Sequence, residues 1–426
     1  KKPDEQRIKD SVFVNRHGLL DWRLASGAGM FEQVPPQAFY RAWDGGDKPH
    51  TSATILVGCN LGYGLNHLLT NTPDSHKIIL VEPHPELLLA CLGQTDYRPF
   101  VEAKKLHLAL PEDDYLWELI KNLDLQYVYG VINLRADLPS QQIGPEYAAL
   151  LERIRGRVEN FAVEMNTLRS RQDVMVGNEL QNFQRALADG SLAGLAGTAA
   201  GVGAVILGAG PSLPRFAPEL RRDRGYALYA TALQTMPTVQ ALDLVPDFCL
   251  AIDYDPSMLR IFDRLDLDKA ANVPLIYSTK VQPDLVRRYP GPTIPLWTIG
   301  GMATFALKDR ELVLDAGGNV SLTLIRFLRW CGVSRLVLAG QDFAWQGEQT
   351  HAAGHHAAGR KLRFNPKIHQ KIKNLHGETI ITSAQFIAAK RELELDIRKS
   401  PFPIFNIYGG GAVIEVSDEG EGIREE

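Results

Sequence analysis

The stretch Val205–Leu213 constrains the fold of this chain more than any other. An apolar run stops at Gly208 and Gly210, and a short turn containing Ser212 then leads into a helical pattern. Glycine lets the backbone approach a ligand closely. The start of the following helix offers unpaired N–H groups and the positive end of its dipole to an anion. This order of elements predicts an α/β fold with a phosphate-binding turn, and it favours a nucleotide or a nucleotide-sugar as the ligand.

The turn differs from a dinucleotide fingerprint. A Rossmann site for NAD requires G-x-G-x-x-G and an acid at the end of the second strand. Here Leu213 stands at the third glycine position, and the next expected strand, Tyr226–Ala230, ends at Thr231. NAD is therefore disfavoured. The alternative that the turn serves packing alone stays open, since such turns also occur without a ligand.

At 426 residues the chain is long enough for two or three domains of about 150 residues each. Residues 1–145 contain expected strands at 54–57, 77–81 and 127–132. The first two enclose a glycine-rich turn at 58–64, and the second ends in Glu82, which is a βαβ pattern. Residues 146–200 repeat apolar side chains at three- and four-residue intervals. We expect a small α/β domain followed by a helical connector.

Residues 201–360 alternate strands with helices, and residues 361–426 form a separate C-terminal region. The expected strands are 204–207, 226–230, 248–252, 275–278 and 336–339. In an open α/β sheet, ligands bind beyond the carboxyl ends of the strands, so these ends are expected to meet at one crevice. In the C-terminal region a basic stretch, read as a solvated face, precedes a helix capped by Ser383 and running to Glu394. The fold class is α/β, with a Rossmann-like central nucleotide-binding domain, a smaller α/β N-terminal domain and a helical connector and C-terminal region.

Composition excludes several classes of protein. A formal net charge of −4 argues against a broad nucleic-acid surface. The 4 cysteines lie far apart without a C-x-x-C pair, so neither zinc nor a disulfide framework is indicated. The uncharged run at 190–214 is rich in Gly and Ala and only weakly apolar, which disfavours a transmembrane helix. We expect a cytoplasmic protein that binds neither nucleic acid nor membrane; its oligomeric state stays open.

Several motifs together resemble the Maf (motility-associated factor) family of flagellin glycosyltransferases. They are Gly208–Leu213, Asp253–Pro256, Gly317–Ser321, Leu338–Ala344 and Thr350–Ala352, and the 58–64 turn with Glu82 resembles the Maf N-terminal domain. The resemblance implies an inverting protein O-glycosyltransferase that needs no cofactor. Its donor would be a CMP-activated nonulosonic acid of the pseudaminic, legionaminic or sialic type, and its acceptor a Ser or Thr of flagellin.

The same central motifs are similar to the bacterial CMP-sialic-acid transferases, with departures. Where those enzymes have asparagines facing the nucleotide, this chain has Ala209, Thr231 and Asp255. His351 falls nearest to their phosphate-binding tyrosine, and His376 nearest to their catalytic histidine.

These comparisons and the strand ends define the candidate site residues. Asp342, His351 and His376 are the catalytic candidates, and the choice between general base and phosphate partner stays open. Asn319 is expected to bind an anion, with a plain helix N-cap as the alternative. The remaining substrate-binding candidates are Gly208, Gly210, Ser212, Thr231, Asp253, Asp255, Ser321, Gln341 and Thr350.

Two rival functions stay open. The central segment is also similar to archaeal enzymes that transfer pyrophosphate from ATP to 6-hydroxymethyl-dihydropterin. In that case Asp253, Asp255 and Asp342 would bind Mg²⁺, which prefers carboxylate oxygens, although such an enzyme would not need the outer segments. The second rival is a non-catalytic flagellin-binding protein.

Two further motifs are discounted. We expect no metal site at His351, His355 and His356, because glycines interrupt the helix that their spacing requires. The 58–64 turn with Glu82 is typical of an S-adenosylmethionine fold, but within a Maf-like chain we interpret it as structural.

Overall fold

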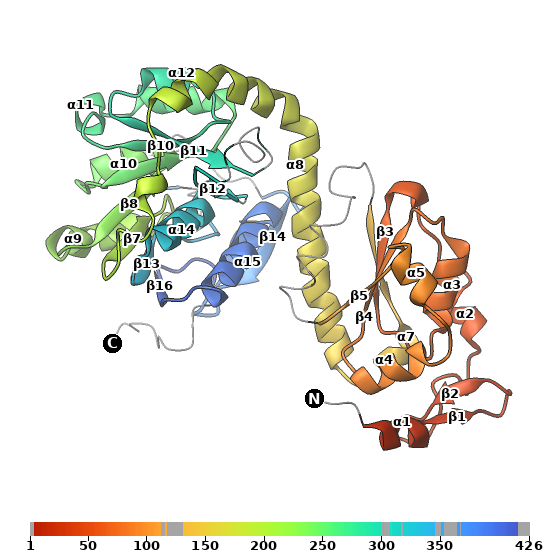
Figure 1. Cartoon of the computed structure of the whole chain (residues 1–426). Coiled ribbons are helices and arrows are strands. Elements are labelled where there is room, and N and C mark those ends of the chain that lie inside the picture. Colours follow the sequence, from red (N-terminus) through yellow and green to blue (C-terminus); the bar gives the residue numbers. More distant parts are fainter. Residues whose placement is uncertain are drawn as a thin grey trace. The chain divides into compact units, whose positions relative to one another are not determined.

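The computed structural model describes residues 4–111, 116, 131–299, 301, 307, 309–316, 318–345, 351–352, 364–366 and 368–415. The chain forms two compact units, Lys1–Met165 and Asn166–Glu426. Helix α8 (Glu146–Ala188, 43 residues) contains the boundary between them, and the side chains of residues 163–169 lie outside the description. This helix (Figure 1) covers most of the predicted connector.

The first unit is built on a parallel sheet with the strand order β5-β4-β3-β6. Its strands are β3 (Ala53–Val57), β4 (Lys77–Val81), β5 (Leu106–Ala109) and β6 (Ile132–Ala136). Its helices are α1 (Glu5–Ser11), α2 (Pro36–Tyr40), α3 (Tyr63–Asn71), α4 (Pro85–Leu92), α5 (Arg98–Glu102) and α7 (Leu138–Gln141). A 3₁₀ turn η1 (Pro49–Thr51) and an antiparallel hairpin of β1 (Val12–Val14) and β2 (Leu20–Trp22) complete it.

Successive side chains of the central strand β3 enter two apolar cores, one on each face of this sheet. Leu56 packs in a cluster with Leu65 and Leu68 of α3, whereas Ile55 packs in a cluster with Tyr147 and Ile154 of α8. This alternation is the pleat of a strand covered on both faces. The predicted strands 54–57 and 77–81 are confirmed. Of the strand predicted at 127–132, residues 127–130 lie outside the described residues.

The second unit contains an eight-stranded sheet in which all neighbours are parallel, in the order β12-β11-β10-β9-β8-β7-β13-β16. The strands are β7 (Gly203–Leu207), β8 (Leu228–Ala232), β9 (Phe248–Ala251), β10 (Leu275–Ser278), β11 (Thr293–Thr298), β12 (Val313–Leu314), β13 (Arg335–Ala339) and β16 (Ile404–Ile407). The chain builds outward from β7 to β12 and then returns to place β13 on the other side of β7. The carboxyl ends of β7 and β13 are therefore a topological switch point, where ligands bind in such sheets.

Helices cover both faces of this sheet (Figure 1). On one face lie α14 (Val320–Cys331) and α15 (Ala384–Arg398); on the other lie α9 (Leu213–Arg222), α10 (Met236–Ala241), η5 (Pro256–Asp263) and α12 (Pro283–Arg288). The remaining elements are α11 (Leu267–Ala270), the 3₁₀ turns η3 (Ala193–Leu195) and η4 (Leu233–Thr235), and a hairpin of β14 (His369–Lys373) and β15 (Thr379–Ser383).

The five strands predicted for the second unit are present, but β8 begins two residues later than predicted, at Leu228, and β9 ends at Ala251. Strand β11 was not predicted, because Pro295 at its centre reads against a strand. It is tolerated because, among the described residues, β12 pairs with Trp297 and Thr298 of β11 and none pairs with β11 on that side at Pro295. The α/β fold class is confirmed.

Ser383 caps α15 as predicted, by accepting a hydrogen bond from the N–H of Phe386 (3.2 Å). The helix continues beyond the predicted end at Glu394, to Arg398. Lys371 and Lys373 of the basic stretch are exposed on β14, as a solvated face requires.

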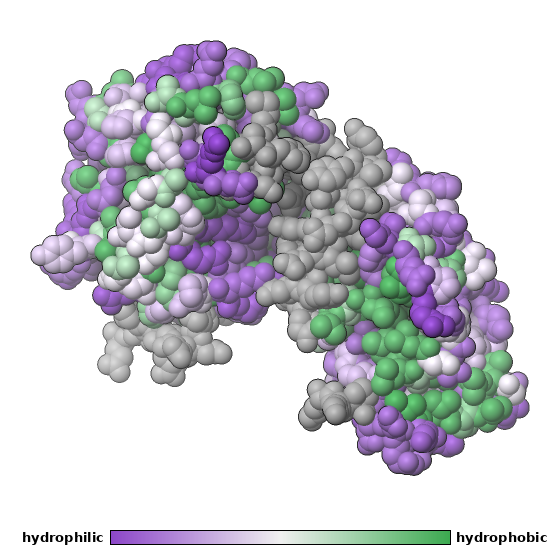
Figure 2. Space-filling view, in the orientation of Figure 1, coloured by the Kyte–Doolittle hydropathy of each residue, from purple (hydrophilic) through white to green (hydrophobic). Residues whose placement is uncertain are grey.

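Apolar side chains are exposed in both units, among them Leu89 of α4 (44%) and Val245 (63%), and Figure 2 shows green areas on both. Such exposure is common on soluble proteins. Among the helices of the described residues, none combines the length and apolar character that crossing a bilayer requires.

Candidate functional site

A pocket of about 310 Å³ lies at the switch point of the second unit. Its walls are the turn after β7, the end of β8, the start of α14, the turn after β13 and the side chains of His351 and Phe386. Of the predicted site residues, the pocket brings together Gly208, Gly210, Asn319, Ser321, Gln341, Asp342 and His351.

The two glycines of the β7 turn allow it to pack against the turn that follows β13. The N–H of Gly210 donates to the carbonyl oxygen of Gly340 (2.9 Å), and a Cβ atom on Gly210 would lie 2.6 Å from that oxygen. A Cβ atom on Gly208 would lie 2.4 Å from the same oxygen. Side chains are excluded at both positions by this packing, so the glycines are explained before any ligand is considered.

Asp342 holds the β7 turn in place. It is 5% exposed, and its carboxylate accepts hydrogen bonds from the N–H (2.9 Å) and the hydroxyl (2.6 Å) of Ser212. Burial raises the pKa of Asp342, and the two bonds from Ser212 oppose that rise. Both donors of Ser212 are thus engaged within the protein, so a phosphate at this turn would have to share or displace the Asp342 carboxylate.

The start of α14 is better prepared for an anion. Asn319 is its N-cap, with its side-chain oxygen accepting from the N–H of Ser321 (2.8 Å), so the capping alternative is confirmed. Within the described part of the chain, the N–H of Val320 has no hydrogen-bond partner. This helix of 12 residues therefore presents a free N–H and its positive dipole end at the pocket wall.

Two amides at the pocket have atoms without partners. The side-chain oxygen of Gln341 accepts from the hydroxyl of Ser321 (3.0 Å), but the buried amide nitrogen has no partner among the described residues. The same holds for the buried side-chain oxygen of Gln234, which follows β8. An unsatisfied buried polar group costs about 1–3 kcal/mol. A ligand that supplied an acceptor and a donor would relieve both.

Gln234 was missed by the sequence prediction, which stopped at the strand end Thr231. The available signal was its position three residues beyond that end, on the crevice side of the sheet.

His351 lies at the mouth of the β7 turn. The N–H of the next residue, Ala352, donates to the carbonyl oxygen of Ala209 (3.0 Å), and His351 itself lines the pocket. Thr350, His355 and His356 lie outside the described residues.

Five predicted residues do not line the pocket, and Ser212, which bonds Asp342 behind the turn, is one of them. The hydroxyl of Thr231 donates to the carbonyl of Leu207 (2.7 Å) inside the sheet. Asp253 accepts from the N–H of Asp255 (3.0 Å), and Asp255 in turn caps η5. Hydrogen bonding by Ser257, chiefly from its N–H, holds the pKa of Asp255 below its usual value. His376 lies in the β14–β15 turn, where its N–H donates to Asn374 (3.0 Å).

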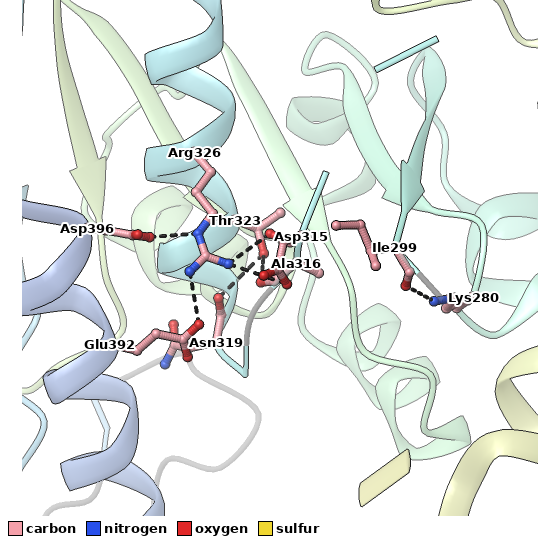
Figure 3. Close-up of polar contacts among 9 residues, drawn as sticks. All are labelled: Lys280, Ile299, Asp315, Ala316, Asn319, Thr323, Arg326, Glu392 and Asp396. Carbon is pink, nitrogen blue, oxygen red and sulfur yellow. Dashed lines mark hydrogen bonds and ion pairs between the residues drawn. The ribbon is translucent and has the colours of Figure 1, made fainter. Parts of the chain in front are cut away.

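The loop that leads into α14 is held by Arg326 (Figure 3). The guanidinium donates to the carbonyl of Asp315 (3.0 Å) and forms ion pairs with Glu392 (2.9 Å) and Asp396 (2.7 Å) on α15. Burial opposes the charge, but Asp396, Asp315 and Glu392 raise the pKa of Arg326 above its ordinary value. The hydroxyl of Thr323 also bonds the carbonyl of Ala316 (2.5 Å). These contacts fix the approach to Asn319 and thus the position of the helix start.

The glycine turn of the first unit is arranged differently. The carboxylate of Glu82 accepts from the N–H of Cys59 (2.9 Å), the N–H of His84 (2.9 Å) and the hydroxyl of Tyr147 (2.5 Å). A Cβ atom on Gly62 would lie 2.4 Å from the hydroxyl of Tyr97. The acid that would hold a ribose is satisfied by the protein itself, which supports a structural role for this turn.

No group of three or more His, Cys, Asp or Glu residues suited to a metal ion occurs among the described residues. Asp253 and Asp255 follow β9, whereas Asp342 follows β13 and is bonded to Ser212. The magnesium ligand set proposed for the pyrophosphate-transfer rival is therefore not assembled.

Comparison with known proteins supports the resemblance drawn from the motifs. Residues 177–348 match the family model described as 6-hydroxymethylpterin diphosphokinase MptE-like, and residues 44–109 match that of the glycosyltransferase Maf N-terminal domain. No curated protein matches the chain. The solved structure of a Maf glycosyltransferase from Magnetospirillum magneticum AMB-1 has the same fold, with a TM-score of 0.60 and 16% identity over 96% of this chain and 71% of that one. The chain thus resembles the Maf glycosyltransferases, with a Maf N-terminal domain and an MptE-like central domain.

Proposed function

We propose that this chain is a cytoplasmic glycosyltransferase that moves a nonulosonic acid from a CMP donor to a Ser or Thr hydroxyl of flagellin. The domain matches support a glycosyltransferase. The observation that carries the finer proposal is the pocket at the switch point, where the start of α14, two unsatisfied amides and His351 meet. Such a pocket suits a nucleotide, whose phosphate is an anion and whose nucleobase has both hydrogen-bond donors and acceptors.

The pocket residues have distinct roles in this reaction. As the bond between the anomeric carbon and the CMP phosphate breaks, negative charge grows on the phosphate, and the free N–H of Val320 and the positive dipole end of α14 stabilise it. The acceptor oxygen attacks the opposite face of the anomeric carbon, forms the new bond and inverts the configuration. Its proton passes to a general base.

His351 is the base that we favour, because it lines the pocket and histidine is the side chain that most often serves as a general base. Asp342 is less suited, since both hydrogen bonds from Ser212 occupy its carboxylate.

The test is calorimetric titration with CMP, and in parallel with ATP and Mg²⁺, followed by transfer from CMP-sialic acid to purified flagellin. Wild-type protein is expected to bind CMP, and Ser321→Ala, which frees Gln341, is expected to weaken that binding. His351→Ala should lower transfer by about 10²–10⁴-fold. Asp268→Asn on the exposed surface of α11 serves as the control. Full transfer by His351→Ala would exclude His351 as the base.

The second candidate is pyrophosphoryl transfer, which the match to the MptE-like model favours. It predicts binding of ATP with Mg²⁺, release of AMP and no response to CMP. Flagellin binding without affinity for either nucleotide would instead support a non-catalytic partner.

A further inference from the structure

Lys280 follows β10 at the carboxyl edge of the large sheet, outside the pocket already described. Its ammonium nitrogen donates to the carbonyl oxygen of Ile299 at 2.8 Å (Figure 3). It forms no ion pair with any residue that the structure describes. A lysine ammonium has three N–H donors and no acceptor. Two of its donors are therefore left for a ligand.

The charges around Lys280 compensate it only in part. Burial lowers its pKa, and the negative charges of Glu179 and Asp315 act in the opposite direction. Glu179 is 1% exposed and accepts from the hydroxyl of Thr279 (3.1 Å), while Asp315 pairs with Arg326 (3.5 Å). Neither carboxylate forms an ion pair with Lys280. A half-buried cation that forms no ion pair with the described residues gains more from a bound anion than an exposed lysine does.

Lys280 lies beyond the pocket, along the same carboxyl edge of the sheet. Strand β10 is two strands from β8, whose end lines the pocket, and neighbouring strands are about 4.8 Å apart, so the two strand ends are roughly 10 Å apart. The loop from Asp315, which acts on Lys280, leads to Asn319 in the pocket wall. A nucleotide in the pocket would thus direct the sugar on its phosphate along the same edge.

We propose that Lys280 binds the carboxylate of an acidic donor sugar and so selects acidic over neutral sugars. The proposal rests on the function proposed above, and it assigns this lysine to recognition of the donor rather than to the chemical step. Neutral nucleotide-sugars lack the anion that would occupy its two remaining donors.

The test compares Lys280→Met, which keeps the length of the side chain, with Lys280→Arg, which keeps the charge. CMP, which carries no sugar, and CMP-sialic acid are titrated against each variant. Lys280→Met is expected to bind CMP as the wild type does. Its affinity for CMP-sialic acid should fall about 10–100-fold, and its KM should rise by the same factor, the range of a charged hydrogen bond. Its kcat should change little, and Lys280→Arg should recover part of the loss.

Lys269→Met on α11 is the matched control, since Lys269 is exposed and pairs with Asp243. Thermal melting establishes that each variant folds. If Lys280→Met does not fold, the comparison of Lys280→Arg with the wild type decides whether Lys280 contributes to the affinity for CMP-sialic acid. Unchanged affinity for CMP-sialic acid in Lys280→Met would overturn the proposal. A fall in kcat at unchanged KM would overturn it too, by placing Lys280 in the chemical step. Wild-type protein that binds neither CMP nor CMP-sialic acid would refute the proposed function, and this inference with it.

Discussion

The two units each carry a glycine-rich turn at the carboxyl end of a parallel strand, but their surroundings differ. After β3, the turn at 58–64 is packed by the chain's own side chains: Tyr97 fills the space beside Gly62, and Glu82 and Asp137 satisfy the polar groups around it. After β7, the turn at 208–212 is braced by Asp342 from behind and faces a pocket of about 310 Å³.

The difference teaches that a glycine turn indicates a place where two segments approach closely, and that neighbouring side chains decide whether a ligand can enter. Both turns follow buried strands and precede helices, so their local patterns are alike. Asp137 shows how the polar groups around the first turn are satisfied by the protein itself. It is fully buried and accepts from Tyr40 (2.8 Å), Asn60 (2.7 Å) and the N–H of Ser140 (2.8 Å).

The largest effect is expected from Asp137→Ala. The change leaves several buried donors in the first unit without an acceptor, so the free energy of unfolding should fall by about 3–5 kcal/mol. Urea unfolding followed by circular dichroism measures this loss. Asp96→Ala at the exposed Arg98 pair is the control, and its free energy of unfolding should stay close to that of the wild type. A loss below about 1 kcal/mol for Asp137→Ala would contradict the view that this turn is held by its own polar network.

A pair of glycine substitutions separates packing from binding. Gly62→Ala (φ +94°, with Tyr97 in the way) and Gly210→Ala (with Gly340 and Asp342 in the way) should each cost about 1–3 kcal/mol in stability. Only Gly210→Ala should also weaken CMP binding, by about tenfold or more, because it displaces a wall of the pocket.

The matched control for this pair is Gly318→Ala, where an added Cβ atom meets no atom within 4 Å. Calorimetric titration with CMP and urea unfolding give the two readouts for all three variants. Equal loss of CMP affinity in Gly62→Ala would show that the first unit also takes part in nucleotide binding.

The smallest effect is expected from Asp342→Asn, which keeps an acceptor for Ser212. The folded-state pKa of Asp342 is raised above 3.8 by burial, so its contribution to stability is full below pH 3.8 and is lost as the pH rises through the folded pKa. An asparagine side chain does not ionise, so the variant does not lose this stability as the pH rises. Stability at pH 7 should therefore stay within about 1 kcal/mol of the wild type or rise slightly.

Unfolding of Asp342→Asn and wild type measured between pH 4 and pH 8 should show curves that diverge as the pH rises. Parallel curves would show that Asp342 does not titrate as its burial implies. Loss of all transfer with intact CMP binding would return Asp342 to the role of base.

Much of the fold was predictable, because the signals are local. The order of strand, glycine turn and helix placed β7 and α9, and the caps at Asn319 and Ser383 follow from side chains that bond N–H groups two or three residues away. Prediction failed at β11, where Pro295 is tolerated because of the neighbouring strands, and at the start of β8. Seven of the predicted site residues line the pocket, whereas Ser212, Thr231, Asp253, Asp255 and His376 do not.

The sequence by itself determined the α/β class, the sites of the turns and the helix start that faces the pocket, since periodicity, glycine and capping act over a few residues. Only the tertiary structure decided which turn opens into a pocket. The bond from Ser212 to Asp342 joins residues 130 positions apart, and the approach of Lys280 to Ile299 joins neighbouring strands. Such partners depend on how separate segments pack, and the same local pattern in the first unit brings Tyr97 instead of a ligand space.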